Sequence, residues 1–309
     1  MKVSAQVPAT IANLGCGFDC LGLALPIYNT VTVEETVLPG SGIEINIISE
    51  DDENDTSNIP RDKSNIVYKA IELLYNYIGQ SPNELKISIK TQIPVARGLG
   101  SSASVIVGGL YAANELLGRP ADEAVLLSIA TEIEGHPDNI APAILGGVVL
   151  SDWEGDGSVV ANKLPWPDDW VITICIPDYE LSTEISRSVL PKEVSMKDAI
   201  YNLRHSAMFV QAVYEKNEEL MKLSLKDKLH QPYRMKLVPG LSQIMNDLKH
   251  TEGVLGCVLA GAGPSVAIIQ NGTKNDVIKE IVQNAWNNIN VNAQIYTLPV
   301  LNEGAKIIL

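Results

Sequence analysis

One short stretch decides the fold: Ile93-Pro94-Val95-Ala96-Arg97-Gly98-Leu99-Gly100-Ser101-Ser102-Ala103-Ser104. The alternating residues before it predict a strand over 86–93, and the apolar residues after it predict a helix over 101–117. Gly98 and Gly100 reach backbone conformations that other residues avoid, so the neighbouring amides can converge on one point. The helix start adds its positive dipole end and two serine hydroxyls. The stretch therefore predicts a cradle for a triphosphate, with a serine-capped tight turn as the alternative.

Two other nucleotide-binding motifs do not fit the sequence. A P-loop needs lysine followed by serine or threonine, and no lysine follows Gly100. A second glycine run follows a predicted strand and reads Gly261-Ala262-Gly263-Pro264-Ser265. It is a poor dinucleotide fingerprint, because Val266 stands where close helix packing needs glycine or alanine, and Pro264 is out of place.

Strands and helices alternate on both sides of the first stretch. Ser64 is predicted to cap a helix before it, and residues 135–139 are predicted to form a turn after it. Residues 151–169 are rich in glycine, aspartate, proline and tryptophan, and they mark the expected domain boundary. We therefore expect one domain over residues 1–160 and a second over 161–309. Further strands are expected over 3–8, 28–34, 43–47, 148–150, 170–176, 255–259 and 292–297, and further helices over 196–217, 241–250 and 275–287.

Charge and composition exclude several classes of protein. Lysine and arginine number 23 against 37 aspartate and glutamate, and a net charge of −14 repels the phosphates of nucleic acids. No apolar stretch approaches the ~20 residues that span a bilayer, and the first residues lack the apolar core of a signal peptide. Three of the histidines, His205, His230 and His250, are predicted on helix surfaces. We expect a soluble, cytoplasmic enzyme with no nucleic-acid or membrane partner.

Four motifs together resemble those of the GHMP small-molecule kinases. Residues 94–104 are similar to the family's ATP-binding loop, and residues 261–265 to its C-terminal glycine motif. The members that phosphorylate L-homoserine carry two further motifs. These are similar to Pro8-Ala9-Thr10-Ile11-Ala12-Asn13-Leu14-Gly15-Cys16-Gly17-Phe18-Asp19 and Glu134-Gly135-His136-Pro137-Asp138-Asn139-Ile140-Ala141-Pro142. All four motifs stand in the family's order between residues 8 and 265.

The resemblance implies a fold and a reaction. The fold would be α+β with two domains, the N-terminal one like the second domain of ribosomal protein S5 and the C-terminal one ferredoxin-like. ATP and the substrate would lie between them. The reaction would transfer the γ-phosphate of Mg-ATP to the side-chain hydroxyl of L-homoserine, which gives O-phospho-L-homoserine for threonine synthesis. A homodimer is the family's usual form. Mevalonate or shikimate as the substrate, and a regulator without activity, are the alternatives.

The resemblance also assigns residues to ATP and Mg²⁺. The backbone amides of residues 97–104 would hold the phosphates. Mg²⁺ prefers hard oxygen ligands and takes few of them from the protein. A serine at the helix start, Ser101 or Ser102, would bind it together with Glu134. Glu132 lies nearly opposite Glu134 on the helix and is expected to be an exposed charge.

Homoserine is a zwitterion, so its site needs a carboxylate for the ammonium and a guanidinium for the carboxylate. By resemblance, Asn13 and Asp19 fit the ammonium, and Thr183, Arg187 and Arg234 fit the carboxylate. Thr183 and Arg187 are spaced to share one helix face. For each arginine, a surface ion pair is the alternative. Mevalonate has no ammonium, so it would leave Asp19 without a partner.

The chemical step belongs to the motif around His136. By resemblance, His136 and Asn139 lie near the substrate hydroxyl, and Gly261 lies beside the substrate. Some relatives use an aspartate at the position of Asp138 as a general base with the help of a lysine, but this motif holds no lysine. A hydroxyl can also lose its proton late, to the phosphate itself. Asp138 is therefore either the base or a residue that caps the turn.

Overall fold

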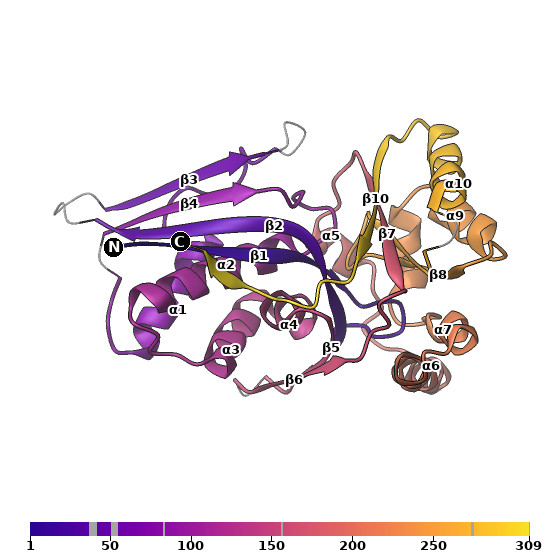
Figure 1. Ribbon diagram of the computed structural model, residues 1–309, viewed down its shortest axis with the longest axis horizontal. Helices are drawn as coiled ribbons and strands as arrows, with labels where there is room; N and C mark the ends of the chain where they lie inside the picture. Colours follow the sequence, from indigo (N-terminus) through magenta and orange to yellow (C-terminus); the bar gives the residue numbers. More distant parts are fainter. Residues whose placement is uncertain (37–41, 51–54, 83, 156, 273–274, 309) are drawn as a thin grey trace.

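The computed structural model describes residues 1–36, 42–50, 55–82, 84–155, 157–272 and 275–308. They form two sheets with helices packed against them (Figure 1). Within these residues the first sheet has seven strands: β1 (Lys2–Ala12), β2 (Leu21–Glu35), β3 (Ile43–Ser49), β4 (Leu85–Thr91), β5 (Val148–Trp153), β6 (Val159–Leu164) and β11 (Lys306–Ile308). The order is β11-β1-β2-β4-β3, while β5 pairs with the start of β2 and with β6. The parallel pair in this sheet is β3 with β4.

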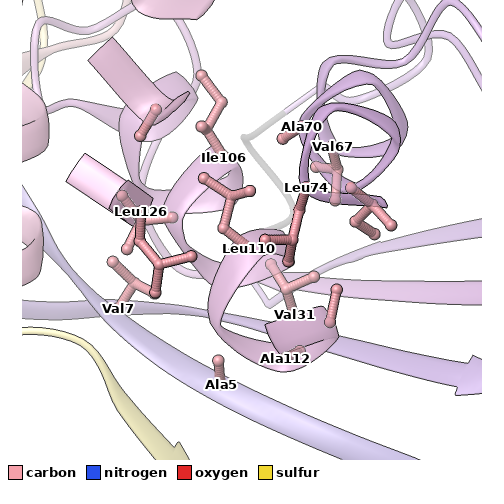
Figure 2. Packing of buried hydrophobic residues seen from close by; sticks show 14 of the residues in the cluster. Ala5, Val7, Val31, Val67, Ala70, Leu74, Ile106, Leu110, Ala112 and Leu126 are labelled. Carbon is pink, nitrogen blue, oxygen red and sulfur yellow. The ribbon is translucent and has the colours of Figure 1, made fainter. Parts of the chain in front are cut away.

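Helices cover one face of the first sheet (Figure 1). They are α1 (Ile66–Tyr77), α2 (Ser101–Leu116), α3 (Glu123–Glu134) and α4 (Pro137–Leu145). Figure 2 shows Val7 of β1 and Val31 of β2 beneath Leu110 of α2, with Leu74 of α1 beside them, all fully buried. Because α2 lies at the centre of this core, its first residue, Ser101, is held at a fixed place at the end of the sheet.

The second sheet is antiparallel and follows the order β10-β7-β9-β8. Its strands are β7 (Val171–Pro177), β8 (Val254–Leu259), β9 (Val266–Gln270) and β10 (Ala293–Pro299). Between β7 and β8 run α5 (Thr183–Ser188), α6 (Met196–Glu215), α7 (Glu218–Ser224), α8 (Gln231–Arg234), a 3₁₀ turn (Met235–Leu237) and α9 (Leu241–Leu248). Helix α10 (Asn275–Asn287) joins β9 to β10. This β-α-β-β-α-β path confirms the predicted ferredoxin-like half of an α+β fold.

A shared apolar core joins the two halves. Ile11 of β1 and Leu23 of β2 belong to the same buried cluster as Ile172 of β7 and Phe209 of α6. The chain crosses from the first sheet to the second between β6 and β7, so the division expected at residue 160 falls inside β6. The last strand, β11, returns to the first sheet and pairs with β1.

Some local expectations are wrong. Asn65, not Ser64, caps α1, because its side-chain oxygen accepts a hydrogen bond from Val67 N at 2.9 Å. The turn expected over 135–139 is shorter: Gly135 and His136 link α3 to α4, and α4 already begins at Pro137, since proline fits the first turn of a helix, where no amide partner is needed. His205 and His230 are buried rather than at the surface, and only His250 of the three is exposed.

Candidate active site

A cavity of about 350 Å³ lies where the two halves meet, which is in the range of small-molecule sites. Loop 94–100 and the start of α2 form one side of it, and α5, α8 and the turn after β8 contribute from the second half. Predicted site residues that line it are residues 94–102, Asn13, Asp19, Glu134, His136, Asp138, Asn139, Thr183, Arg187, Arg234 and Gly261. Ala103 and Ser104 are fully buried and lie outside this lining.

The glycine loop is shaped by close contact with other backbone segments. Gly98 and Gly100 have φ values of +76° and +66°, which favour glycine. A Cβ on Gly98 would lie 2.3 Å from the carbonyl oxygen of Ala260, and one on Gly100 would lie 2.0 Å from Oγ1 of Thr10. The loop can therefore reach this position only with glycines there. Ser104 serves the fold behind it, because its hydroxyl accepts a 2.7 Å hydrogen bond from the buried Asn29.

Two side-chain oxygen groups, a hydroxyl and a carboxylate, meet at the start of α2. The hydroxyl of Ser102 donates to Oε2 of Glu134 at 2.9 Å, whereas the hydroxyl of Ser101 points back to the carbonyl oxygen of Ile93 at 3.4 Å. Burial raises the pKa of Glu134, although the positive charge that His136 can carry and the hydrogen bond from Ser102 oppose this. Glu132 is exposed and is not among the residues that line the cavity.

Opposite charges face each other at the other end of the cavity. Arg187 donates two hydrogen bonds to Asp19, from Nη1 to Oδ2 at 3.1 Å and from Nη2 to Oδ1 at 2.8 Å. Both side chains keep about a third of their surface exposed, at 37% and 36%. Asn13 fixes the loop that carries Asp19: its Oδ1 accepts from the amide of Asp19 at 3.0 Å, and its Nδ2 donates to the carbonyl of Gly261 at 3.1 Å. Thr183 lies exposed at the rim of the cavity.

Arg234 is the buried cation of this end, with only 2% of its surface exposed. Its Nε donates to the carbonyl oxygen of Ser186 at 3.3 Å, and its Nη1 donates to the carbonyl oxygen of Gly261 at 3.2 Å. Burial, together with the nearby charge of Arg187, lowers the pKa of Arg234 to about 10. Arg234 therefore remains charged near neutral pH and has no carboxylate bonded to it in the part of the chain that the structure describes.

A histidine–aspartate pair lies between the two ends. Nδ1 of His136 is 2.7 Å from Oδ1 of Asp138, whose side chain is 1% exposed. Burial by itself lowers the pKa of His136, but the hydrogen bond to Asp138 and the charges of Asp138 and Glu134 outweigh it, so the pKa is raised. Asn139 accepts a 2.8 Å hydrogen bond from the hydroxyl of Thr10, the residue in contact with Gly100. The loop and the pair are thus linked through Thr10.

Comparisons with known proteins agree with the resemblance that the four sequence motifs indicate. Residues 65–147 match the model of the GHMP kinases N terminal domain. A homoserine kinase from Microchaete diplosiphon is 40% identical over 305 residues, which cover 99% of this chain and 97% of the relative. One from Synechocystis sp. is 41% identical over 308 residues and covers 99% and 98%. This chain belongs to the homoserine kinases of the GHMP kinase family.

Solved structures agree with this family assignment. The crystal structure of homoserine kinase from Cytophaga hutchinsonii has a TM-score of 0.88 at 29% identity and covers 99% of this chain and 97% of that one. A mevalonate kinase at 19% identity, with a TM-score of 0.68, shares the fold. Membership of this kinase family implies the use of ATP. None of the helices that the structure describes is long and apolar enough to cross a membrane.

The apolar end of the cavity was not predicted from the sequence. This end is lined by residues of β3, β4, α1, α2 and the segment that leads into α1, and most of them are apolar. These residues are Ile47, Ile59, Asn65, Ile66, Val67, Ile89, Thr91 and Val105. Ile47 and Ile89 alternate along their strands as ordinary core residues do, so no local signal marks them. Only the fold shows that they line the same cavity as loop 94–100.

Proposed function

We propose that this protein transfers the γ-phosphate of ATP to the side-chain hydroxyl of L-homoserine, which yields ADP and O-phospho-L-homoserine. The observation that carries the proposal is the Asp19–Arg187 pair at one end of a cavity whose other end is the glycine loop. Full-length relatives named homoserine kinase at about 40% identity support the same reaction.

The charge pair fits a zwitterion better than a simple carboxylic acid. Asp19 offers a carboxylate to an ammonium, while Arg187 and the buried Arg234 offer guanidinium groups to a carboxylate. An amino acid brings one charge for each side, so its binding replaces one ion pair with two. Mevalonate would compete with Asp19 for Arg187 and would leave the Asp19 carboxylate without a cation. L-Homoserine is therefore the preferred substrate, with Asn13, Thr183 and Gly261 bounding its position.

ATP is assigned to the loop and to the apolar end of the cavity. The amides of residues 97–102 and the N-terminus of α2 suit the negative phosphates. The apolar residues around Ile47, Ile89 and Val105 suit an adenine ring. Ser102 and Glu134 would hold Mg²⁺, because they are hard oxygen donors 2.9 Å apart beside the loop. When bound, Mg²⁺ neutralises charge on the phosphates.

The proton of the substrate hydroxyl is assigned to the His136–Asp138 pair. Asp138 accepts from Nδ1 of His136, which leaves Nε2 of a neutral ring able to accept a proton. The raised pKa of His136 makes that nitrogen a better base than an ordinary imidazole. Among the described residues that line the cavity there is no lysine, so the histidine takes the place of a lysine beside the aspartate. Asn139 orients the hydroxyl from the other side.

The proposal is tested by product analysis with purified protein, Mg²⁺, ATP and L-homoserine. ADP release is followed with a coupled assay, and the second product is identified by mass and by ³¹P resonance. The proposal predicts one phosphate ester on the side-chain oxygen for each ADP formed. ADP release that does not depend on L-homoserine, or a phosphorylated amino or carboxyl group, would refute it.

A further inference from the structure

His230 is a buried histidine that the reaction described above does not use. It lies at the start of α8, and its surface is fully buried. Its Nε2 is 2.8 Å from the carbonyl oxygen of Gly15, and its Nδ1 is 3.3 Å from Nη1 of Arg234. A carbonyl oxygen only accepts, and a guanidinium only donates. The two partners therefore fix one neutral tautomer, with hydrogen on Nε2 and a lone pair on Nδ1.

The surroundings of the ring favour this neutral form. Burial lowers the pKa of His230, and the charge of Arg234 adds to this effect, while the Asp227 carboxylate opposes it. The carboxylate of Asp227 is already engaged, since it accepts hydrogen bonds from the amides of Leu229, His230 and Gln231 and from Nδ2 of Asn202. Its Oδ2 lies 3.6 Å from Nε2 of His230, farther than the carbonyl of Gly15.

The ring also stacks on an aromatic residue that faces both site arginines. The centroids of His230 and Phe18 are 5.1 Å apart at an interplanar angle of 17°. The guanidinium carbon of Arg234 lies 5.2 Å from the Phe18 ring centroid, and that of Arg187 lies 5.7 Å from it. Phe18 immediately precedes Asp19. One histidine thus touches the segment that carries Asp19 and the arginine across from it.

The contacts of Arg234 show what the histidine adds. Its Nε bonds to Ser186, and its Nη1 bonds to Gly261 and to His230. Across the described part of the chain, its Nη2 makes no hydrogen bond to protein, while the residue lines the cavity. Without His230, the backbone carbonyls of Ser186 and Gly261 would be its remaining bonded partners.

We propose that His230 is a positioning residue for substrate recognition, which holds Nη1 of Arg234 so that Nη2 is presented to the substrate carboxylate. Its second bond, to Gly15, fixes Arg234 relative to the loop that carries Asn13 and Asp19. The side chain of His230 thereby sets the distance between Arg234, which binds the substrate carboxylate, and Asp19, which binds the substrate ammonium. This inference rests on the proposed function, because it assigns Arg234 to an amino-acid carboxylate.

Two substitutions separate the two bonds of the ring. His230→Asn keeps an oxygen acceptor near the position of Nδ1, and His230→Gln keeps a donor near the position of Nε2. We expect His230→Gln to raise the KM for L-homoserine about tenfold, the effect of losing one hydrogen bond to a charged group. The KM for ATP and kcat should change less than twofold. For His230→Asn the KM for L-homoserine should stay close to that of the wild type. His250→Gln, which changes the exposed histidine, should have the wild-type KM.

A double substitution and a measurement on the unaltered protein complete the test. In an Arg234→Gln background, His230→Gln should add less than twofold to the KM for L-homoserine, because its effect passes through Arg234. In the wild type, ¹⁵N histidine spectra should show His230 as the Nε2–H tautomer without titration between pH 6 and 8. Equal KM values for His230→Asn and His230→Gln, a full additive effect, or an imidazolium or Nδ1–H signal would each overturn the proposal. Absence of L-homoserine phosphorylation by the wild type would instead overturn the proposed function, and the spectra do not depend on it.

Discussion

The two ends of the cavity are built by different means. The phosphate end is one continuous segment, residues 94–102, and backbone conformation with two obligatory glycines gives it its shape. The amino-acid end collects side chains from separate places in the chain: Asp19 before β2, Arg187 on α5 and Arg234 on α8. Its properties come from charge and from the bonds that orient those side chains.

This difference teaches where specificity resides. A backbone cradle recognises phosphates in general, since amides and a helix dipole attract any negative group of that size. A set of distant side chains can change one residue at a time without altering the cradle. Substitutions at the two ends should therefore affect different kinetic constants.

The largest effect is expected where the two ends meet. Asp138→Asn should lower kcat by about 10²–10⁴-fold in a folded protein if the His136–Asp138 pair takes the proton. The base must be unprotonated, so the wild-type rate rises with pH through the pKa of His136. Burial lowers that pKa, but the hydrogen bond to Asp138 and the charges of Asp138 and Glu134 raise it on balance. Removing the Asp138 charge should lower the pKa of His136, so the rising part of the pH–rate profile should move to lower pH. If kcat fell only a few-fold and the rising part of the pH–rate profile stayed at the same pH, Asp138 would be a structural residue.

Arg187→Ala tests the amino-acid end. It removes the guanidinium for the substrate carboxylate and leaves Asp19 without its two hydrogen bonds. The KM for L-homoserine should rise about 10²-fold, because a hydrogen bond to a charged group contributes about 1.5–3 kcal/mol. The KM for ATP should stay within about twofold of the wild type. If steady-state kinetics showed equal increases for both substrates, the division between the two ends would be wrong.

Gly100→Ala tests the phosphate end in the same way. The added Cβ would lie 2.0 Å from Oγ1 of Thr10, at a φ of +66°. A left-handed conformation costs a non-glycine residue about 1–2 kcal/mol, so the loop should move and the KM for ATP should rise about tenfold or more. Isothermal titration with an ATP analogue measures the binding directly. Gly79→Ala is the control, because it has a similar φ of +70° and open space around it. Unchanged ATP binding in the Gly100 variant would contradict the steric argument.

Glu134→Gln should weaken the response to Mg²⁺. Replacing one carboxylate oxygen near Ser102 should raise the Mg²⁺ concentration for half-maximal rate about tenfold, which corresponds to about 1.4 kcal/mol. High Mg²⁺ should restore the rate. Glu132→Gln is a matched control on the same helix, since that residue is exposed and does not line the cavity. The assignment fails if the two variants have the same Mg²⁺ dependence.

The smallest effect on catalysis is expected at Ser104. It belongs to the motif that predicts ATP binding, yet its hydroxyl bonds to Asn29 and to the carbonyl of Ser101 and is buried. Ser104→Ala should lower the free energy of unfolding by about 1 kcal/mol, with the KM for ATP unchanged within twofold. Urea unfolding and kinetics measure the two quantities. A large increase in the KM for ATP would place Ser104 on the phosphate side after all.

The sequence predicted the loop better than its surroundings for a physical reason. Glycine spacing, the strand before it and the helix after it are local signals, and the loop, strand and helix stand where they indicated. The burial of His230 was not predicted, because its partner, the carbonyl of Gly15, is brought to it only by the fold. The burial of His205 was not predicted either, although its hydrogen bond is local, to the carbonyl of Tyr201. The apolar end around Ile47 and Ile89 was missed because those residues look like any strand core.

The substrate assignment rests on residues that only the fold brings together. Resemblance named Asp19, Arg187 and Arg234, but their spacing along the chain says nothing about their distance in space. The structure places Arg187 on Asp19 and buries Arg234 beside Gly261. It also shows that the hydroxyl of Ser102 bonds to Glu134, whereas that of Ser101 bonds to the carbonyl of Ile93.

The substrate itself tests the central claim most directly. ADP formation from Mg-ATP should be measured with L-homoserine, D-homoserine, L-serine, L-threonine, mevalonate and shikimate at equal concentrations. The charge arrangement predicts kcat/KM for L-homoserine well above that for every other alcohol. Turnover with mevalonate or shikimate but not with L-homoserine would contradict the roles given to Asp19 and Arg187. Binding of ATP with no turnover of any alcohol would contradict the assignment of a kinase reaction to this cavity.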